Sequence, residues 1–137
     1  MPSAAWDRTD RRILATLQRE GRLPNAELAE RVNLSPSACL RRLQRLEQSG
    51  VIKGRVALLD RAALGLDVTI FAHVKLSTQG RDAIAAFSEA IRERPEVPDC
   101  YTTMGEWDFM LRVVTRDIKA YEAFYLDHLS KLPYVQS

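Results

Sequence analysis

The sequence predicts an α+β fold in two parts, because the spacing of its apolar residues changes near residue 68. Before that point, apolar residues recur at helical spacing in three short segments. Beyond it, strand-like alternation and helical spacing follow one another. The 137 residues suffice for one ordinary domain or two small ones. We therefore assign residues 1–55 to a first domain, residues 56–67 to a linking strand and connection, and residues 68–137 to a second domain.

Two helices are predicted at the start of the chain. Asp7 suits a helix N-cap, and Asp10 three residues later favours the first turn, so a helix should run from there to a stop at Gly21. A second helix can begin at Asn25. The residues expected to face inward are Ile13, Leu14 and Leu17 on the first helix, and Leu28, Ala29 and Val32 on the second.

A short turn at Asn33 and Leu34 leads into the third helix. Ser35 is a strong N-cap, and Pro36 occupies the first helical position, where its missing N–H costs nothing. Gly50 ends this helix. Residues 51–59 then read as a strand that leaves the three-helix unit.

The second part alternates strands and helices. We predict strands over 69–76, 97–104 and 109–115, helices over 81–94 and after an N-cap at Asp117, and a fourth strand that begins at 134–136. This is the ferredoxin-like βαββαβ pattern with its last strand cut short. The expected inward residues are Ile70, Ala72, Val74, Leu76, Ile84, Phe87, Ile91, Phe109, Leu111, Val113, Ile118, Tyr121, Tyr125 and Leu129.

Charge is divided unevenly between the two parts. Residues 1–55 carry a net charge of +5 and the remainder −3, although the chain as a whole is only +2. A basic front half suggests a polyanionic partner for that half alone. The alternative is a chance asymmetry.

The third helix sorts its side chains into two faces. Cys39, Leu40, Leu43 and Leu46 form an apolar stripe; Ser37, Arg41, Gln44, Arg45 and Gln48 lie opposite, with Arg42 on the flank. Arginine can bond guanine and glutamine can bond adenine in a major groove. A solvated polar face is the alternative, but such faces usually mix both signs of charge. We therefore predict double-stranded DNA as the partner, contacted by Ser35, Ser37, Arg41, Arg42, Gln44, Arg45, Lys53 and Arg55.

Several motifs together resemble one family. They are WDRTDRRIL (6–14), GR (21–22), AELA (26–29), LSPS (34–37), CLRRL (39–43), LEQSGVI (46–52) and GEWD (105–108). In this combination they resemble the leucine-responsive/asparagine-regulator (Lrp/AsnC) transcription regulators over residues 6–135. The resemblance implies a winged helix-turn-helix joined to a ferredoxin-like domain that forms homodimers and higher assemblies such as tetramers or octamers. It also implies an amino-acid effector bound between subunits.

The resemblance places the effector at the Gly-x-x-Asp loop. It points to Gly105 and Asp108, with Met104 and Trp107 as walls. A carboxylate such as Asp108 suits an α-ammonium, and backbone N–H groups near Gly105 suit an α-carboxylate. The alternative is a tight turn between two strands, which explains the same residues.

Other functions are less well supported by the residues. Some proteins that resemble the family are sirohaem decarboxylases, but His73 and His128 are the chain's two histidines, and we expect a regulator rather than an enzyme. An architectural DNA binder without an effector is a further alternative.

Cys39 and Cys100 fit no metal spacing, so no metal or resident cofactor is expected. With no apolar run near 20 residues and no signal peptide at residues 1–7, we expect a cytoplasmic, membrane-free protein.

Overall fold

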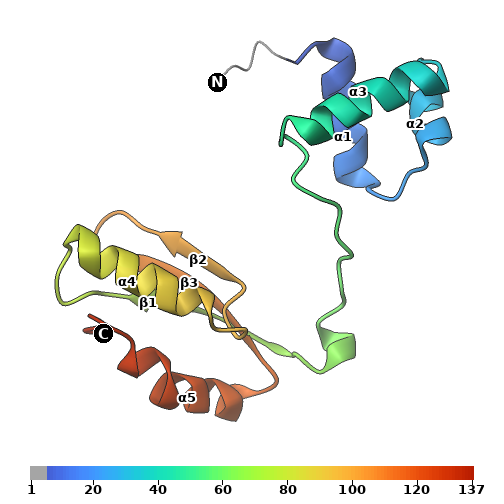
Figure 1. Cartoon of the computed structure of the whole chain (residues 1–137). Coiled ribbons are helices and arrows are strands. Elements are labelled where there is room, and N and C mark those ends of the chain that lie inside the picture. The colour runs from blue at the N-terminus through green and yellow to red at the C-terminus, as the bar shows by residue number, and fades with distance from the viewer. Residues whose placement is uncertain (1–5) are drawn as a thin grey trace. The chain divides into compact units, whose positions relative to one another are not determined.

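The computed structural model describes residues 6–137, which divide between Leu58 and Leu59 into two compact units (Figure 1). Each unit has its own buried core. Residues 1–5, on which the signal-peptide argument partly rested, lie outside the described residues. Within the described range, none of the helices has the length and apolar character needed to cross a membrane.

The N-terminal unit is built from three helices, α1 (Arg8–Arg19), α2 (Asn25–Arg31) and α3 (Pro36–Gln48). Both predicted N-caps are confirmed. Asp7 and Asp10 form a reciprocal capping box on α1, and the Ser35 hydroxyl accepts from the Ala38 N–H on α3. The core contains Ile13, Leu28, Ala29, Val32, Cys39, Leu43 and Leu46. Burial raises the pKa of the Cys39 thiol, in keeping with its place in this core.

The turn between α2 and α3 sets how the third helix projects. Asn33 adopts a left-handed backbone with φ of 58°, a conformation that asparagine tolerates better than most residues. The next N–H, that of Leu34, donates to the Ala29 carbonyl at 2.9 Å. A tight turn between two short helices is the geometry of a helix-turn-helix.

Two expectations for this unit are wrong. Leu40 is exposed rather than part of the apolar stripe, because Cys39, Leu43 and Leu46 already fill the contact with the other helices. Residues 51–59 form no strand. A strand needs a neighbour to bond its backbone, and the described chain places none beside this segment. Val56 and Leu58 are consequently almost fully exposed.

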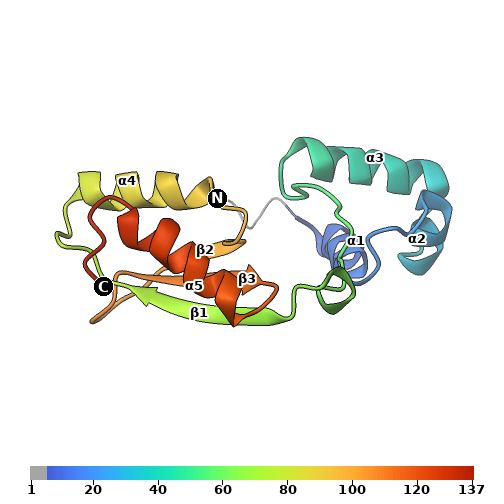
Figure 2. The same cartoon turned by 90° about the horizontal axis from the view of Figure 1, so that it is seen from below.

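The C-terminal unit is a three-stranded antiparallel sheet in the order β1-β3-β2, with two helices on one face (Figures 1 and 2). The strands are β1 (Val68–Val74), β2 (Asp99–Thr102) and β3 (Phe109–Thr115); the helices are α4 (Arg81–Arg92) and α5 (Ile118–Asp127). The 3-10 turns η2 (Ala62–Leu64) and η3 (Leu129–Lys131) precede β1 and follow α5. As predicted, Asp117 caps α5 by accepting from the Ala120 N–H.

The end of the chain pairs with the residues after β1 at the place where a fourth strand is predicted to begin. Leu76 and Val135 form an antiparallel bridge beside β1. The Lys75 N–H donates to the Ser137 carbonyl at 2.7 Å, and the Gln136 N–H donates to the Lys75 carbonyl at 2.8 Å. The strand order is thus that of a ferredoxin-like sheet.

The core between sheet and helices contains the predicted Phe87, Ile91 and Leu129, but it differs from prediction at other positions of both helices. On α4, Ala83 is buried with Phe87 and Ile91, while Ile84 is exposed. On α5, Phe124 is buried, while Ile118 and Tyr125 are exposed. The large phenylalanine rings determine which face of each helix turns inward, because their burial removes the most apolar surface from water.

Candidate nucleic-acid interface and the β2–β3 loop

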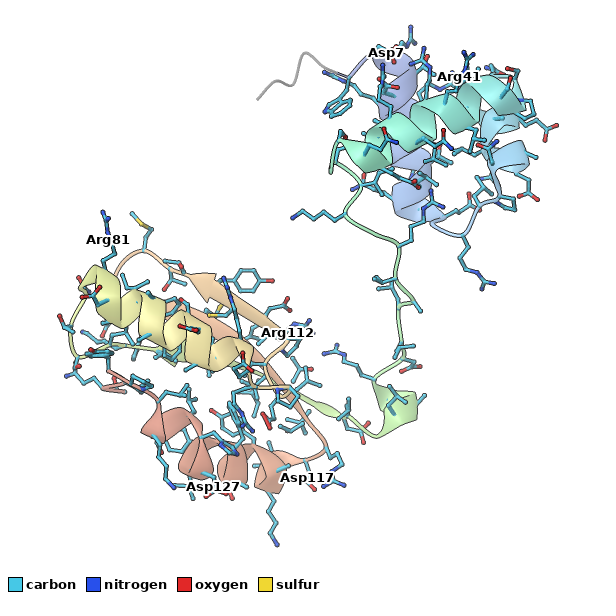
Figure 3. All side chains as sticks on the ribbon, in the orientation of Figure 1. Asp7, Arg41, Arg81, Arg112, Asp117 and Asp127 are labelled. Atoms are coloured by element: carbon cyan, nitrogen blue, oxygen red, sulfur yellow. The ribbon has the colours of Figure 1, made fainter. Side chains whose placement is uncertain are left out.

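The face of α3 opposite the core is polar and open to solvent. Its members Ser37, Arg41, Gln44, Arg45 and Gln48 lie on the solvent side of the helix, as the helical spacing predicts. Figure 3 labels Arg41 on this helix. Arg41 and Gln44 are three positions apart and therefore lie side by side on the helix surface.

Two arginines of α3 are bound within the protein, which the sequence did not reveal. Arg42 Nη1 donates to Asp7 Oδ2 at 2.6 Å and to Asp10 Oδ1 at 3.0 Å. Arg45 Nη2 donates to Asp10 Oδ2 at 2.5 Å. Asp10 is completely buried. The available signal was an acidic pair at the start of an otherwise basic unit, which we interpreted as a helix cap alone.

The remaining predicted DNA contacts fall into two groups. Ser35 uses its hydroxyl to cap α3 and lies 3.4 Å from the Ser37 hydroxyl. Lys53 and Arg55 follow α3 on the unpaired segment, and both are exposed. Arg55 Nη2 donates to Glu47 Oε1 at 3.1 Å. An exposed pair of this kind exchanges readily with water or phosphate, because it contributes little stability.

The acidic end of α1 shifts the ionisation of two groups. The Asp10 N–H lowers the pKa of the Asp7 carboxyl, and the Arg42 side chain lowers it further. In turn, hydrogen bonds to Asp7 and Asp10 raise the pKa of Arg42. Both charges are therefore retained across the physiological range.

We expect the Asp7 charge to stabilise the N-terminal unit only above acidic pH. A carboxyl whose pKa is lower in the folded chain contributes stability above its ordinary value of 3.8, and loses it as the pH falls through the lowered value. Asp7→Asn removes the charge but keeps a good N-cap. Urea unfolding followed by Trp6 fluorescence, in a Trp107→Phe background, should show wild type more stable than Asp7→Asn at about pH 6. The difference should vanish toward about pH 2; a difference independent of pH would contradict this.

The loop between β2 and β3 is organised around Asp108. Its N–H donates to the Val74 carbonyl, and its carboxylate accepts from the Leu76 N–H at 2.8 Å and from Gln79 Nε2 at 3.1 Å. Gly105 has φ of 109°, a left-handed conformation that favours glycine. The loop is therefore tied to the end of β1 rather than held by its own residues alone.

The two predicted walls of this loop lie in different surroundings. Trp107 stacks on His73 of β1, with ring centroids 5.7 Å apart and an interplanar angle of 21°. Met104 is 99% exposed, so its side chain makes almost no contact with the rest of the described chain. The structure thus brings Trp107 and Asp108 against β1 and leaves Met104 and Gly105 at the outer edge of the loop.

Known proteins resemble both units. Residues 7–53 match the winged helix-turn-helix DNA-binding family, and residues 69–137 match the Lrp/AsnC ligand binding domain. The transcriptional regulator AzlB of Bacillus subtilis is 39% identical over 127 residues, which cover 93% of this chain and 81% of AzlB.

Solved structures agree over nearly the whole chain. A transcriptional regulator from Neisseria meningitidis, solved as a complex with L-methionine, is 41% identical with a TM-score of 0.91, covering 96% of this chain and 85% of that one. A feast or famine regulatory protein from M. tuberculosis, also complexed with L-methionine, is 30% identical with a TM-score of 0.84, covering 95% and 86% of the two chains.

Proposed function

Because the chain belongs to the Lrp/AsnC family of DNA-binding transcription regulators, we propose that the exposed face of α3 reads DNA bases through Arg41 and Gln44. The chain is a regulator with an amino-acid ligand-binding domain, and it is not an enzyme. The observation that carries the proposal is the acid-free polar face of α3, on which both side chains lie. Their donor groups suit guanine and adenine edges in a major groove.

The other basic and hydroxyl groups divide between phosphate contacts and structure. We assign Ser37, Lys53 and Arg55 to phosphates, which add affinity without reading sequence. Ser35 caps α3 and Arg42 is held by two carboxylates, so neither is retained as a base contact. Selection of bound duplexes from a random library, followed by band shift, tests the proposal. Equal affinity for selected and scrambled duplexes would contradict it.

For the ligand, we propose an α-amino acid bound at the β2–β3 loop. Backbone N–H groups near Gly105 would take the carboxylate, Asp108 the ammonium, and Trp107 would form a wall. Asp108 already accepts two hydrogen bonds from the chain, but each carboxylate oxygen has two acceptor sites and can take a further donor. The methionine complexes of the two related regulators support this class of ligand.

Calorimetry of the full chain against the twenty amino acids should detect binding that Asp108→Asn weakens at least tenfold. The amide keeps an acceptor for the Leu76 N–H, but it removes the charge that pairs with an ammonium and the oxygen that accepts from Gln79 Nε2. Glu106→Gln is the matched control, since it removes a carboxylate from the same loop, and it should leave the Kd unchanged. Absence of heat with every amino acid, or equal effects of both variants, would refute this site.

A homodimer is the third part of the proposal. The strand register puts Phe71, Arg112, Met110 and Tyr101 on the sheet face that carries no helices. Phe71 is 58% and Tyr101 50% exposed, and an Arg112–Asp99 ion pair lies on the same face (Figure 3 labels Arg112). An open sheet face with large apolar side chains is typical of an interface. A second copy could also pair with the unpaired segment 51–59, whose backbone needs a neighbouring strand.

Phe71→Asp together with Tyr101→Asp should weaken self-association at least a hundredfold, because each buries a charge at the interface. Sedimentation velocity over a range of concentrations measures this, and would also reveal tetramers or octamers. Leu126→Asp on α5 is the control, since it charges an exposed apolar residue outside the sheet. Unchanged association of the double variant would rule out the sheet face as the interface.

A further inference from the structure

One buried carboxylate joins the N-terminus of α1 to the middle of α3. The Asp10 side chain is 0% exposed. It accepts from Arg42 Nη1 at 3.0 Å, from Arg45 Nη2 at 2.5 Å and from the Asp7 N–H at 3.3 Å. The two arginines are three positions apart, so a single acidic group fixes two neighbouring cations of the helix that carries the polar face.

Arg42 is held back from the surface by this arrangement. Its side chain is 30% exposed and bonds both Asp7 and Asp10. A carboxylate that is completely buried must remain paired, because an unpaired charge in the interior is far more costly than one in water. Moving Arg42 to a phosphate would remove one of the two cations that neutralise Asp10.

Arg45 is held differently. Its side chain is 57% exposed, and its bond to Asp10 uses Nη2. A guanidinium has five N–H donors in a rigid plane, so anchoring one nitrogen leaves donors available to a ligand. The anchored side chain has already lost much of its rotational freedom, which lowers the entropic cost of a later contact.

We propose that Asp10 is a positioning residue for DNA recognition, which withholds Arg42 from DNA and fixes Arg45 beside Arg41 and Gln44 in a rigid reading face. The inference rests on the proposal that this face of α3 reads bases. It makes a specific prediction: neutralising Asp10 frees Arg45 and leaves Arg42 paired with the exposed Asp7, an ion pair that exchanges readily with phosphate, so both arginines then bind phosphates of any sequence. Discrimination between sequences falls while affinity for unrelated DNA is kept or increased.

The test compares full-length wild type with Asp10→Asn on two duplexes, one selected by the wild type and one scrambled. In fluorescence anisotropy, Asp10→Asn should bind the selected duplex about tenfold more weakly and the scrambled duplex at least as tightly as wild type. On the scrambled duplex, the slope of log K against log salt should steepen by about 0.9 for each additional phosphate that a freed arginine neutralises. A purely structural role would weaken both duplexes alike. That result, or undiminished binding to the selected duplex, would overturn the inference.

Two further variants serve as a control and as a second test of the role of Asp10. Asp7→Asn is the matched control, because Asp7 contacts Arg42 but not Arg45, and it should keep most of the discrimination. Arg45→Lys applies if Asp10→Asn fails to fold. A lysine keeps the charge but cannot present a rigid fork to Asp10 and DNA together, so discrimination should fall about tenfold with an unchanged salt slope. Retained discrimination in Arg45→Lys would also overturn the inference.

Arg41→Ala in the same assay separates this inference from the proposed reading face. If Arg41→Ala binds the selected duplex as tightly as wild type, the proposal that this face of α3 reads bases is refuted. If Arg41→Ala binds it more weakly while Asp10→Asn still discriminates fully between the two duplexes, only the proposed role of Asp10 is refuted.

Discussion

Replacing Arg41 and Gln44 together by alanine is expected to weaken binding to the selected duplex by about thirtyfold or more. Each bidentate contact with a base contributes about 1–3 kcal/mol of discrimination, and about 1.4 kcal/mol corresponds to a factor of ten in affinity. Two such contacts therefore account for roughly 2–6 kcal/mol. Neither side chain belongs to the buried core, so their removal should leave the three-helix unit intact.

The matched control is Gln18→Ala with Arg19→Ala, which removes the same two side-chain types from α1, again outside the buried core. Band shift with the selected and scrambled duplexes should show the loss on α3 only, and mainly on the selected duplex. Circular dichroism checks that both variants remain helical. Equal behaviour of the two double variants would show that basic charge in general, rather than the face of α3, governs binding.

The start of each long helix could be predicted wherever its cap is a local signal. Asp7, Ser35 and Asp117 each accept a hydrogen bond from an N–H three residues on, so the residues that form the cap are close together in the sequence. The strand β3 was equally accessible, since its strict alternation matches a sheet with one buried face. The outward face of α3 followed from helical periodicity in the same way.

Contacts between distant segments were not accessible from local patterns. Asp10 meets Arg42 and Arg45 across 32 and 35 positions, and no spacing rule links them. Asp108 likewise meets Leu76 and Gln79, which lie 32 and 29 positions earlier, so its role in securing β1 could not be separated from a role in binding.

The strand predicted over residues 51–59 was wrong for a different reason. Its composition is strand-like, but a strand is completed by a neighbour, and a sequence pattern cannot say whether that neighbour belongs to the same chain. The predicted stripes of α4 and α5 were wrong at Ile84, Ile118 and Tyr125, which are exposed, and missed Ala83 and Phe124. Ala83 and Phe124 are buried because the sheet covers those positions of the helices, and the packing of sheet on helix cannot be derived from the helical wheel of one segment.

The core of the C-terminal unit should be most sensitive at Phe87, where alanine is expected to lower the free energy of unfolding by about 3–5 kcal/mol. Phe87 is completely buried on α4, and its ring lies 4.6 Å from that of Phe109 on β3. The substitution removes apolar contact between helix and sheet and leaves a cavity. Small domains are stabilised by only about 5–15 kcal/mol, so much of the unit's stability would be lost.

The chain carries one tryptophan in each unit, which allows the two transitions to be measured separately. In a Trp6→Phe background, urea unfolding followed by Trp107 fluorescence should report the full loss in Phe87→Ala. Leu126→Ala, an exposed residue of α5, is the control and should change stability by less than about 0.5 kcal/mol. The Trp6 transition, read in a Trp107→Phe background, should remain close to wild type, because Phe87 belongs to a core that shares no residue with that of α1–α3. An equal shift of both transitions would mean that the two units unfold together. In that case, an amino acid bound to the C-terminal unit would also stabilise the N-terminal unit, without any change in the face of α3 that is proposed to read DNA.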